Sequence, residues 1–501
     1  MKYKIITLLI FLTELSYSQN RNSIWCFGDS AGIDFSSGTP MAYSSGMDGR
    51  GSCVSVADHS GKLLYYASTL PYFGPNSFYA TYVFDSTNSI MQNGDTLFGH
   101  AWYHELVTIP NPANDSTYYL FSIGVTSVFG LFYSVIDMRL NNGLGAVVQK
   151  NIQLQGFEQV DCLNAIKHGN GRDWWLLFRR SQFATGGSNN EWYTYLITAD
   201  SIQSLNVQTI GSQNSTNNAQ VCFSPQGNKL AFSSYMGLLE IYDFDRCTGL
   251  LSNNIIIEPE PTVPPAKYFW SCAFSPDASK LYVSTNETPT YLFQYNLNAA
   301  NIPASKDTIW SLSFPLDAGG QLKLAPDDKI YLSNWYFNGI TTSYPYPDSM
   351  YNMYNMNLSI INHPDSLGAS CDFQPYSFYL GGKRTYVGLP NNPDYELGPL
   401  AGSACDTITS TALSPANQNS NLYVYYHPSW QKAFINAQNL KGSNYIFCVY
   451  DVIGNIIYKE NATLASTYFT KDLNMQRFSK GMYIVTLHTD KEKLVKKFVK
   501  E

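Results

Sequence analysis

The chain has few charged side chains and no long apolar run after its first residues, and both deficits exclude classes of protein. Only 14% of the 501 residues are charged and the net charge is −7, so the chain offers no basic face for a nucleic-acid backbone. After the N-terminus, no stretch approaches the roughly 18 consecutive apolar residues that a transmembrane helix needs. We therefore expect neither nucleic-acid binding nor a membrane helix in the mature protein.

Sequence motifs that carry common chemistry are also missing. The nine cysteines include no C-x-x-C pair, which argues against a zinc cluster or a dense disulfide scaffold. There is no G-x-S-x-G nucleophile motif and no glycine-rich phosphate loop. On these grounds the sequence predicts no catalytic residue, no metal ion and no cofactor.

Two groups of residues could still suggest a site, but each has a simpler explanation. His100, His104 and Glu105 have part of the spacing of a helical metal motif, yet they run directly into a predicted strand at 106–109, which excludes a helix. Four aspartates at strand ends could act as acid and base or bind calcium, although Asp routinely supports turns there. These four are Asp29, Asp34, Asp243 and Asp245.

Aromatic residues, in contrast, are abundant. Aromatics make up 15% of the chain, with 38 tyrosines, which is typical of a β-rich extracellular protein and argues against disorder.

Lys2 and Lys4 precede a short apolar stretch at 5–12, and Ser16 and Ser18 place small residues before a cleavage point. We predict a secretory signal peptide over residues 1–18.

Most of the remaining chain repeats one strand–turn–strand pattern. Its clearest copy is residues 272–284, where an apolar run ends at Ser-Pro-Asp and Lys280 opens a second run rich in β-branched and aromatic residues. Copies recur at intervals of about 50 to 57 residues, which is the spacing of propeller blades. The other copies begin near Val56, Ile109, His168, Cys222 and Leu324.

These repeats predict an all-β fold with a β-propeller of seven blades over residues 19–391. Six repeats are legible, and a seventh is suggested by residues 371–373 and 383–390. We expect strands around Trp25 to complete that blade and close the ring, so that no sheet edge stays open. A β-sandwich would also explain the strands, but not the recurring Ser-Pro-Asp turn.

The cysteines fall into two groups within this predicted ring. Cys26, Cys53 and Cys371 lie near the expected closure, and a disulfide among them is compatible with an oxidising compartment. Cys222 and Cys272 precede equivalent turns, so we expect them on inner strands of neighbouring blades, buried as small apolar side chains.

The composition changes after residue 391. Residues 392–420 are rich in Pro, Gly, Ser and Thr and are typical of a linker. Residues 421–501 contain about seven short strand patterns in roughly 80 residues, which suits a small β-sandwich.

This C-terminal segment resembles the type A sorting domain of the type IX secretion system. The resemblance is carried by residues 449–455, residues 473–485 and the terminal Lys-Lys-Phe-Val-Lys. It implies interaction with the type IX machinery, export across both membranes, and removal of the domain as the protein is released or anchored at the outer surface. Both of these secreted or cell-surface outcomes stay open. The motif residues are Tyr450, Asp451, Gly454, Gly481, Tyr483, Lys496 and Lys497.

The region before it resembles uncharacterised propeller-like ectodomains that often precede such sorting domains, and its Ser-Pro-Asp turns resemble WD40-like repeats of periplasmic propellers. Residues 25–28, 130–138 and 388–391 are among those that carry this resemblance. It implies fold and location, since that family carries no established activity. We expect a non-enzymatic binding or adhesion module for an unknown glycan, peptide or protein. The alternative is an extracellular propeller hydrolase, either a glycosidase or peptidase-like.

Asp followed by Ser or Thr and then an apolar residue or Thr recurs along the chain. Composition alone would give about one or two such triplets. They resemble the O-glycosylation acceptor of bacteria that use this secretion route, but Asp-Ser and Asp-Thr are also good turn formers, so both interpretations stay open. The acceptors would be Ser86, Thr96, Ser116, Ser201, Thr308, Ser349, Ser366 and Thr407.

Overall fold

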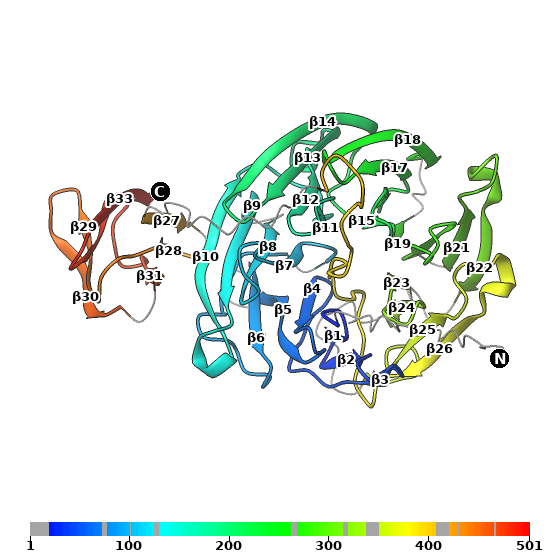
Figure 1. Ribbon diagram of the computed structural model, residues 1–501, viewed down its shortest axis with the longest axis horizontal. Coiled ribbons are helices and arrows are strands. Elements are labelled where there is room, and N and C mark those ends of the chain that lie inside the picture. Colours follow the sequence, from blue (N-terminus) through cyan, green and yellow to red (C-terminus); the bar gives the residue numbers. More distant parts are fainter. Residues whose placement is uncertain are drawn as a thin grey trace, which may run out of the picture.

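The computed structural model describes residues 20–500 apart from short internal segments, and this part of the chain is almost entirely β. A ring of seven sheets is followed by a small domain of two sheets (Figure 1). Among the described residues, no helix is long and apolar enough to cross a membrane. The predicted signal peptide, residues 1–18, lies outside the described residues. The internal segments not described are 73–77, 101, 125–129, 262–267, 288, 314–318, 337–349, 407–419, 429 and 465–466.

Each sheet of the ring begins at an innermost strand and runs outward strand by strand, which defines a seven-bladed propeller as the repeats predicted (Figure 1). The innermost strands are β1 (Ile24–Phe27), β4 (Cys53–Ala57), β7 (Leu106–Pro110), β11 (Asn164–Lys167), β15 (Ala219–Phe223), β19 (Phe269–Phe274) and β23 (Gly319–Leu324). The second strands are β2 (Ala31–Asp34), β5 (Leu63–Tyr72), β8 (Thr117–Gly124), β12 (Trp174–Arg179), β16 (Lys229–Ser234), β20 (Lys280–Thr285) and β24 (Ile330–Asn334). The third strands are β3 (Met41–Ala42), β6 (Phe78–Asp85), β9 (Gly130–Asp137), β13 (Asn189–Ile197), β17 (Leu239–Asp245), β21 (Thr290–Asn296) and β25 (Asn357–Ile361).

The last five blades add an outer fourth strand, and short 3-10 helices lie between some strands. The outer strands are β10 (Ala146–Gln155), β14 (Ile202–Asn214), β18 (Leu250–Glu258), β22 (Asp307–Leu312) and β26 (Phe373–Tyr379). The 3-10 helices are η1 (Asn141–Gly143), η2 (Phe183–Thr185), η3 (Pro303–Ser305) and η4 (Gly368–Cys371).

The recurring turn of the sequence joins the first and second strands of a blade. Between β19 and β20, the Asp277 carboxylate accepts a hydrogen bond from the Ser279 N–H at 2.8 Å. Ala278 takes a positive φ of 56°, and Gly227 (72°) and Asp328 (60°) do the same in the equivalent turns. Because the aspartate binds backbone within the turn, the Ser-Pro-Asp pattern reverses the chain at this point.

Apolar side chains between neighbouring sheets form the core of the ring. Trp174 and Trp175 of β12 and Trp192 of β13 are fully buried there. Trp102 and Trp335 are only partly buried and join an aromatic cluster that includes Trp270. Most of the tryptophans named here therefore stabilise the blades rather than offer a free stacking surface.

The ring closes differently from the sequence prediction. Residues 24–42 form a sheet of their own, β1–β2–β3, and do not complete a blade begun by residues 371–373. Phe373 instead begins β26, the outer strand of the last blade. Residues 383–390 form no strand, although Arg384 makes an isolated β-bridge with Asp29. The physical reason is that β1 finds its partner locally in β2, because consecutive strands usually pair. Trp25 then packs edge-on against Tyr331 of β24, which joins the first and last blades.

Residues 421–500 form a second domain whose two sheets face one another. Side chains from both sheets, such as Ile435 and Phe447, share one apolar core, so the predicted β-sandwich is confirmed. One sheet contains β27 (Asn421–His427), β28 (Lys432–Gln438) and β31 (Phe469–Asn474). The other contains β30 (Ile456–Thr463), β29 (Asn444–Asp451), β32 (Gly481–Thr489) and β33 (Lys493–Lys500).

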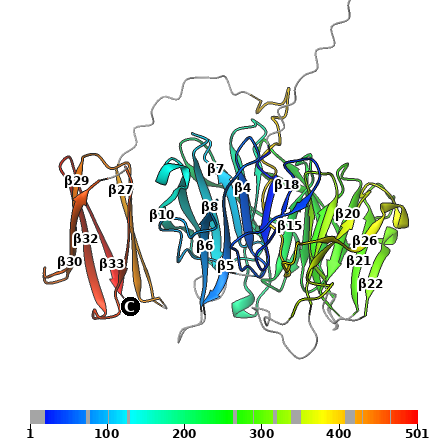
Figure 2. The same ribbon diagram turned by 90° about the horizontal axis from the view of Figure 1, so that it is seen from below.

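This second domain lies against β10, the outer strand of the third blade (Figures 1 and 2). Asn436 of β28 accepts from the Lys150 N–H at 2.8 Å and donates through its Nδ2 to the Lys150 carbonyl at 2.7 Å. Next to this pair, Phe98 is 2% exposed. Its ring contacts those of Phe132, Tyr425, His427, Trp430 and Phe434. The interface thus combines an apolar cluster with two hydrogen bonds between the Asn436 side chain and the Lys150 backbone.

A single disulfide joins described residues, and it is not at the ring closure. Cys247, just after β17, is bonded to Cys405. The disulfide that the sequence allowed among Cys26, Cys53 and Cys371 does not form, since all three are buried free thiols. Cys371 packs in a different apolar cluster from Cys26 and Cys53.

Residues 391–406, here named the strap, lie within or next to the predicted linker but pack onto the ring. Tyr395 is fully buried, and its hydroxyl donates to the Thr108 carbonyl at 2.8 Å. Asn391 donates to the carbonyls of Leu106 and Leu163, both at 2.8 Å. The strap therefore contacts the innermost region of the third and fourth blades.

Candidate binding cavity in the central channel

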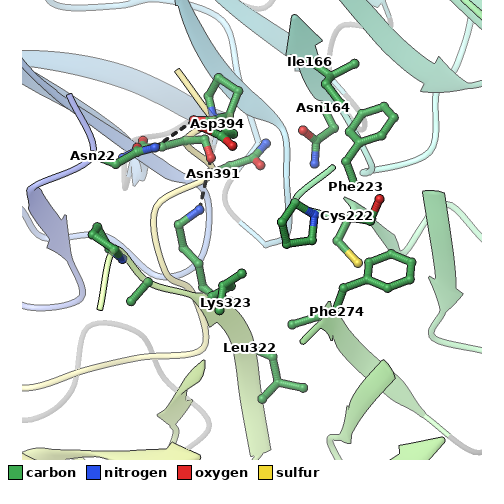
Figure 3. Close-up of a pocket in the computed structure, with 18 of the residues that line it drawn as sticks. Asn22, Asn164, Ile166, Cys222, Phe223, Phe274, Leu322, Lys323, Asn391 and Asp394 are labelled. Atoms are coloured by element: carbon green, nitrogen blue, oxygen red, sulfur yellow. Dashed lines mark hydrogen bonds between the residues drawn. The ribbon is translucent and has the colours of Figure 1, made fainter. Parts of the chain in front are cut away.

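The central channel contains a cavity of about 400 Å³ beside the innermost strands β11, β15, β19 and β23 (Figure 3). The strap contributes to the wall through residues 391–394, 396 and 397, and Asn22, Trp25 and His104 line it as well. This volume falls in the range of about 300 to 1,000 Å³ that is usual for small-molecule sites. The cavity can therefore enclose one small ligand.

Lys323 of β23 places a positive charge in the cavity. Its Nζ donates to the Asn392 carbonyl of the strap at 3.1 Å (Figure 3). Desolvation in the channel lowers the pKa of Lys323 to about 8, and the negative charge of Asp394 opposes part of that effect. The side chain therefore still carries its proton at neutral pH.

Two carboxyl groups of the strap line the same cavity. Burial raises the pKa of Asp394. Burial also raises the pKa of Glu396 to about 7, although the Arg21 N–H donates to its Oε1 at 3.4 Å. A carboxyl group that titrates near neutral pH can donate or accept a proton. The cavity thus contains ionisable groups of both signs.

Three neutral polar side chains meet where the innermost strands begin. Nε2 of Gln220 lies 2.8 Å from Nε2 of His104, and Nε2 of Gln321 approaches the same atom. Burial lowers the pKa of His104 to about 3, so the ring is neutral, and with its proton on Nδ1 its Nε2 can accept a hydrogen bond from one of the amides. Oε1 of Gln220 accepts from the Cys272 N–H at 2.9 Å. The innermost strands therefore hold these amides in fixed orientations.

Apolar and sulfur-containing side chains complete the wall. Phe223 and Phe274 stand at the ends of β15 and β19, and Ile166 comes from β11 (Figure 3). The sulfur atoms of Cys222 and Cys272 lie 3.3 Å apart. These cysteines occupy inner strands of neighbouring blades, as the sequence predicted.

Sequence reasoning missed the residues of this cavity, although one signal was available. Lys323 stands three residues before the turn proline, where Cys222 and Ala273 stand in the other clear copies. A charged residue at an otherwise apolar repeat position could have marked the channel. The strap residues gave no such signal, because a composition rich in Pro and Gly predicts a linker whether or not it is buried.

The four aspartates considered as acid–base or calcium candidates do not meet at one site. Asp29 and Asp34 belong to the first blade, whereas Asp243 and Asp245 lie on β17. Each has a separate partner: Asp29 has Arg384, Asp34 has the Ser36 N–H, Asp243 has Lys229 and Asp245 has the Cys247 N–H.

The motif residues of the C-terminal domain all lie in its four-stranded sheet or the turns beside it. Asp451 ends β29 and accepts from the Asn455 N–H at 2.8 Å, while Gly454 in the same turn has a φ of 90°. Gly481 opens β32, and Lys496 and Lys497 are exposed on the edge strand β33. Tyr450 of β29 pairs with Ile484 of β32, and Tyr483 of β32 pairs with Asp451 of β29.

The candidate glycosylation acceptors are spread over several blades. Thr308 is exposed on β22. The Thr96 hydroxyl donates to the Asp472 carboxylate of the C-terminal domain at 3.2 Å, so Thr96 lies at the interface with that domain. Ser86, Ser116, Ser201 and Ser366 are half-buried, and Ser349 and Thr407 lie outside the described residues.

The fold and the C-terminal domain define a two-domain β-propeller protein that carries an export module. Residues 423–501 match the family described as the secretion system C-terminal sorting domain. The C-terminal domain, hereafter the sorting domain, thus confirms the resemblance to type IX secretion cargo. It indicates a secreted or cell-surface protein that interacts with the secretion machinery. A comparison with curated proteins finds no significant match.

Solved structures with similar strand arrangements are distant in sequence. A candidate 6-phosphogluconolactonase from Bacteroides fragilis is 10% identical, with a TM-score of 0.46, over 74% of this chain and 98% of that chain. A periplasmic gluconolactonase from Pseudomonas aeruginosa is 11% identical, with a TM-score of 0.35, over 82% and 99%. The Cps50 β-propeller domain from Myceliophteria thermophila is 11% identical, with a TM-score of 0.37, over 63% and 94%. At these scores no function is inferred, and the propeller assignment depends on the seven sheets themselves.

Proposed function

We propose that the protein is a non-enzymatic binding module, released or displayed at the cell surface, whose channel cavity holds a small polyhydroxylated ligand such as a sugar. The observation that supports this proposal is the set of oriented amides around neutral His104. Hydroxyl groups both donate and accept hydrogen bonds, and amide side chains offer both functions. Asn22 and Asn164 add two further amides to the wall (Figure 3).

Apolar faces and one cation refine the ligand class. Phe223 and Phe274 offer apolar surface beside the polar groups, a combination usual in small-molecule sites. Lys323 is charged at neutral pH and favours a ligand that carries a negative group. An acidic monosaccharide or disaccharide therefore matches the chemistry of the wall best.

A glycan array followed by titration calorimetry on the purified full chain tests this function. Lys323→Met should weaken binding of acidic sugars by at least about tenfold, because a charge-assisted hydrogen bond is lost. Gln220→Leu should weaken acidic and neutral sugars alike. Lys62→Met is the matched control, since Lys62 is exposed and outside the cavity. Sugar binding that neither cavity variant changes would refute the proposal.

A hydrolase acting in the same cavity is a second candidate, favoured by the two carboxyl groups of the strap. Glu396, with its pKa near 7, could serve as a general acid beside Asp394. Mass spectrometry of each array ligand after prolonged incubation separates the two functions. Products that form with the natural chain but not with Glu396→Gln would establish hydrolysis, and unchanged ligands support binding alone.

We further propose that the exported chain lacks residues 1–18 and carries O-glycans at exposed Asp-Ser or Asp-Thr positions, of which Thr308 is the most accessible described one. Some of these aspartates already act in turns, since Asp85 accepts from the Thr87 N–H at 2.8 Å. Intact-mass measurement of protein from a type IX-secreting host tests both processing steps. A mass equal to that of the bare polypeptide would exclude the glycans.

A further inference from the structure

Three buried ionisable side chains meet between the third and fourth blades, outside the channel cavity. His100 and Glu105 belong to the segment just before β7, and Asp161 belongs to the segment just before β11. Their exposed fractions are 4%, 0% and 0%, respectively. One ligand atom from each lies within 4.8 Å of the others.

Asp161 is the unusual member of this cluster. Among the residues that the structure describes, neither of its carboxylate oxygens has a hydrogen-bond partner. Its backbone is nevertheless held on both sides, because its N–H donates to the Asn217 carbonyl at 2.7 Å and its carbonyl accepts from the His104 N–H at 3.2 Å. Burying a carboxylate without a partner is costly. A fixed, unpartnered and fully buried carboxylate therefore indicates that something else satisfies it.

The spacing of the other two ligands matches a shared cation. Nδ1 of His100 lies 3.3 Å from Oε1 of Glu105, which is long for a hydrogen bond between these groups. Two ligand atoms at about 2.1 Å from one ion, separated by a tetrahedral angle, would be about 3.4 Å apart. The carboxylate of Glu105 is oriented by the N–H groups of Trp102 and Tyr103, at 3.0 and 2.9 Å.

We propose that His100, Glu105 and Asp161 bind one divalent transition-metal ion, Zn²⁺ or Mn²⁺. One imidazole and two carboxylates form a ligand set suited to these ions. Three protein ligands leave a further coordination position for water or another small donor. Such an ion would connect the segments that lead into β7 and β11, and so would tie the third blade to the fourth.

The sequence places His100, His104 and Glu105 close together but predicts no metal site, because these residues lead directly into a strand. In the structure His104 turns to Gln220 and Gln321 in the channel cavity. Asp161, 56 residues after Glu105, takes the remaining place. It is contributed by the next blade, and no local spacing could reveal it.

A shared proton is the competing way to satisfy these carboxyl groups. Burial and the nearby charges of Glu105 and Glu158 raise the pKa of Asp161 well above its usual value. A protonated Asp161 would remain in place without any metal. The two explanations differ in whether metal ions bind with an affinity that depends on Asp161.

The test uses the full chain, stripped with a chelator at pH 7 and titrated separately with ZnCl₂, MnCl₂ and CaCl₂. Calorimetry and metal analysis should show one Zn²⁺ or Mn²⁺ per chain. At a hundredfold excess over Kd, the melting temperature should rise by about 3 °C or more. Asp161→Asn should weaken binding by at least about 100-fold, whereas Asp200→Asn, an exposed carboxylate elsewhere on the ring, should bind like the natural chain.

Each outcome decides the proposal. His100→Gln serves as a second ligand variant if Asp161→Asn does not fold. Loss of binding in whichever of the two variants folds supports the site. The proposal is overturned if the natural chain binds neither Zn²⁺ nor Mn²⁺, if it responds only to Ca²⁺, or if the ligand variants bind as tightly as the natural chain.

Discussion

Replacing Phe98 by alanine should detach the sorting domain from the ring while leaving both folded. The Phe98 ring lies 4.9 Å from that of Trp430 and 5.3 Å from that of Phe434, measured between centroids. Four of its five aromatic neighbours belong to the sorting domain. Removing this side chain therefore affects the docking contact more than the third blade itself.

The size of the effect follows from the burial of Phe98. Truncating a buried Phe to Ala costs about 3 to 5 kcal/mol. Because most of the lost contacts cross the interface, we assign about 3 kcal/mol to docking, with the remainder falling on Phe132 and the blade. A factor of ten corresponds to about 1.4 kcal/mol, so the docked fraction should fall by roughly 100-fold relative to the undocked fraction.

Hydrogen exchange at the Lys150 amide reports this equilibrium directly. That amide donates to Asn436 of the sorting domain, so it exchanges only when the domain undocks or the blade opens. Phe98→Ala should speed its exchange by up to roughly 100-fold while amides in β7 and β8 keep their protection. Phe183→Ala, a half-exposed ring on the propeller, is the control. Unchanged protection of Lys150 in Phe98→Ala would refute the assignment of docking energy to this cluster.

Further predictions concern the disulfide, two buried charges and the ring closure. Cys405→Ala should lower the free energy of unfolding, measured in urea, by about 2 to 4 kcal/mol. Cys448 is a free cysteine, so Cys448→Ala removes no cross-link and should not show this disulfide-dependent loss. The pKa of Lys323 falls from 10.5 to about 8 on folding. Between these two pH values the unfolded chain binds more protons than the folded chain, so stability should rise with pH. Lys323→Met should abolish this rise. The pKa of Glu396 rises from 4.5 to about 7, so stability should fall as pH increases through that range, and Glu396→Gln should remove this fall. At Gly28 (φ +58°) an added Cβ would lie 2.5 Å from the Arg384 carbonyl oxygen; Gly28→Ala should therefore cost about 2 kcal/mol more than Gly38→Ala, which has a similar φ and open space. Equal melting temperatures for the two glycine variants would contradict a tight closure.

The blades were predictable because their information is local. The turn at Asp277 sets the reversal between β19 and β20, and similar turns recur in six of the blades, so periodicity revealed the ring. The sorting domain was predictable for a similar reason, because its hairpin at Asp451 and Gly454 is encoded within a few residues.

Features that depend on distant residues could not be predicted in the same way. The strap contributes Tyr395 to the core, but its sequence is that of an exposed linker. Cys405 meets Cys247 across 158 residues, and Asp161 meets His100 from another blade. In each case the partner comes from a distant part of the chain, which no single repeat contains.

The disulfide between Cys247 and Cys405 has a consequence for maturation. Any cut within residues 407–419 would break the covalent link to the sorting domain but leave the strap attached by a peptide bond at one end and by the disulfide at the other. The part of the wall that carries Asp394 and Glu396 would then survive proteolysis without rearrangement. Removal of the sorting domain and formation of the cavity would be independent events, and the cleaved propeller would leave the secretion machinery with its cavity already assembled.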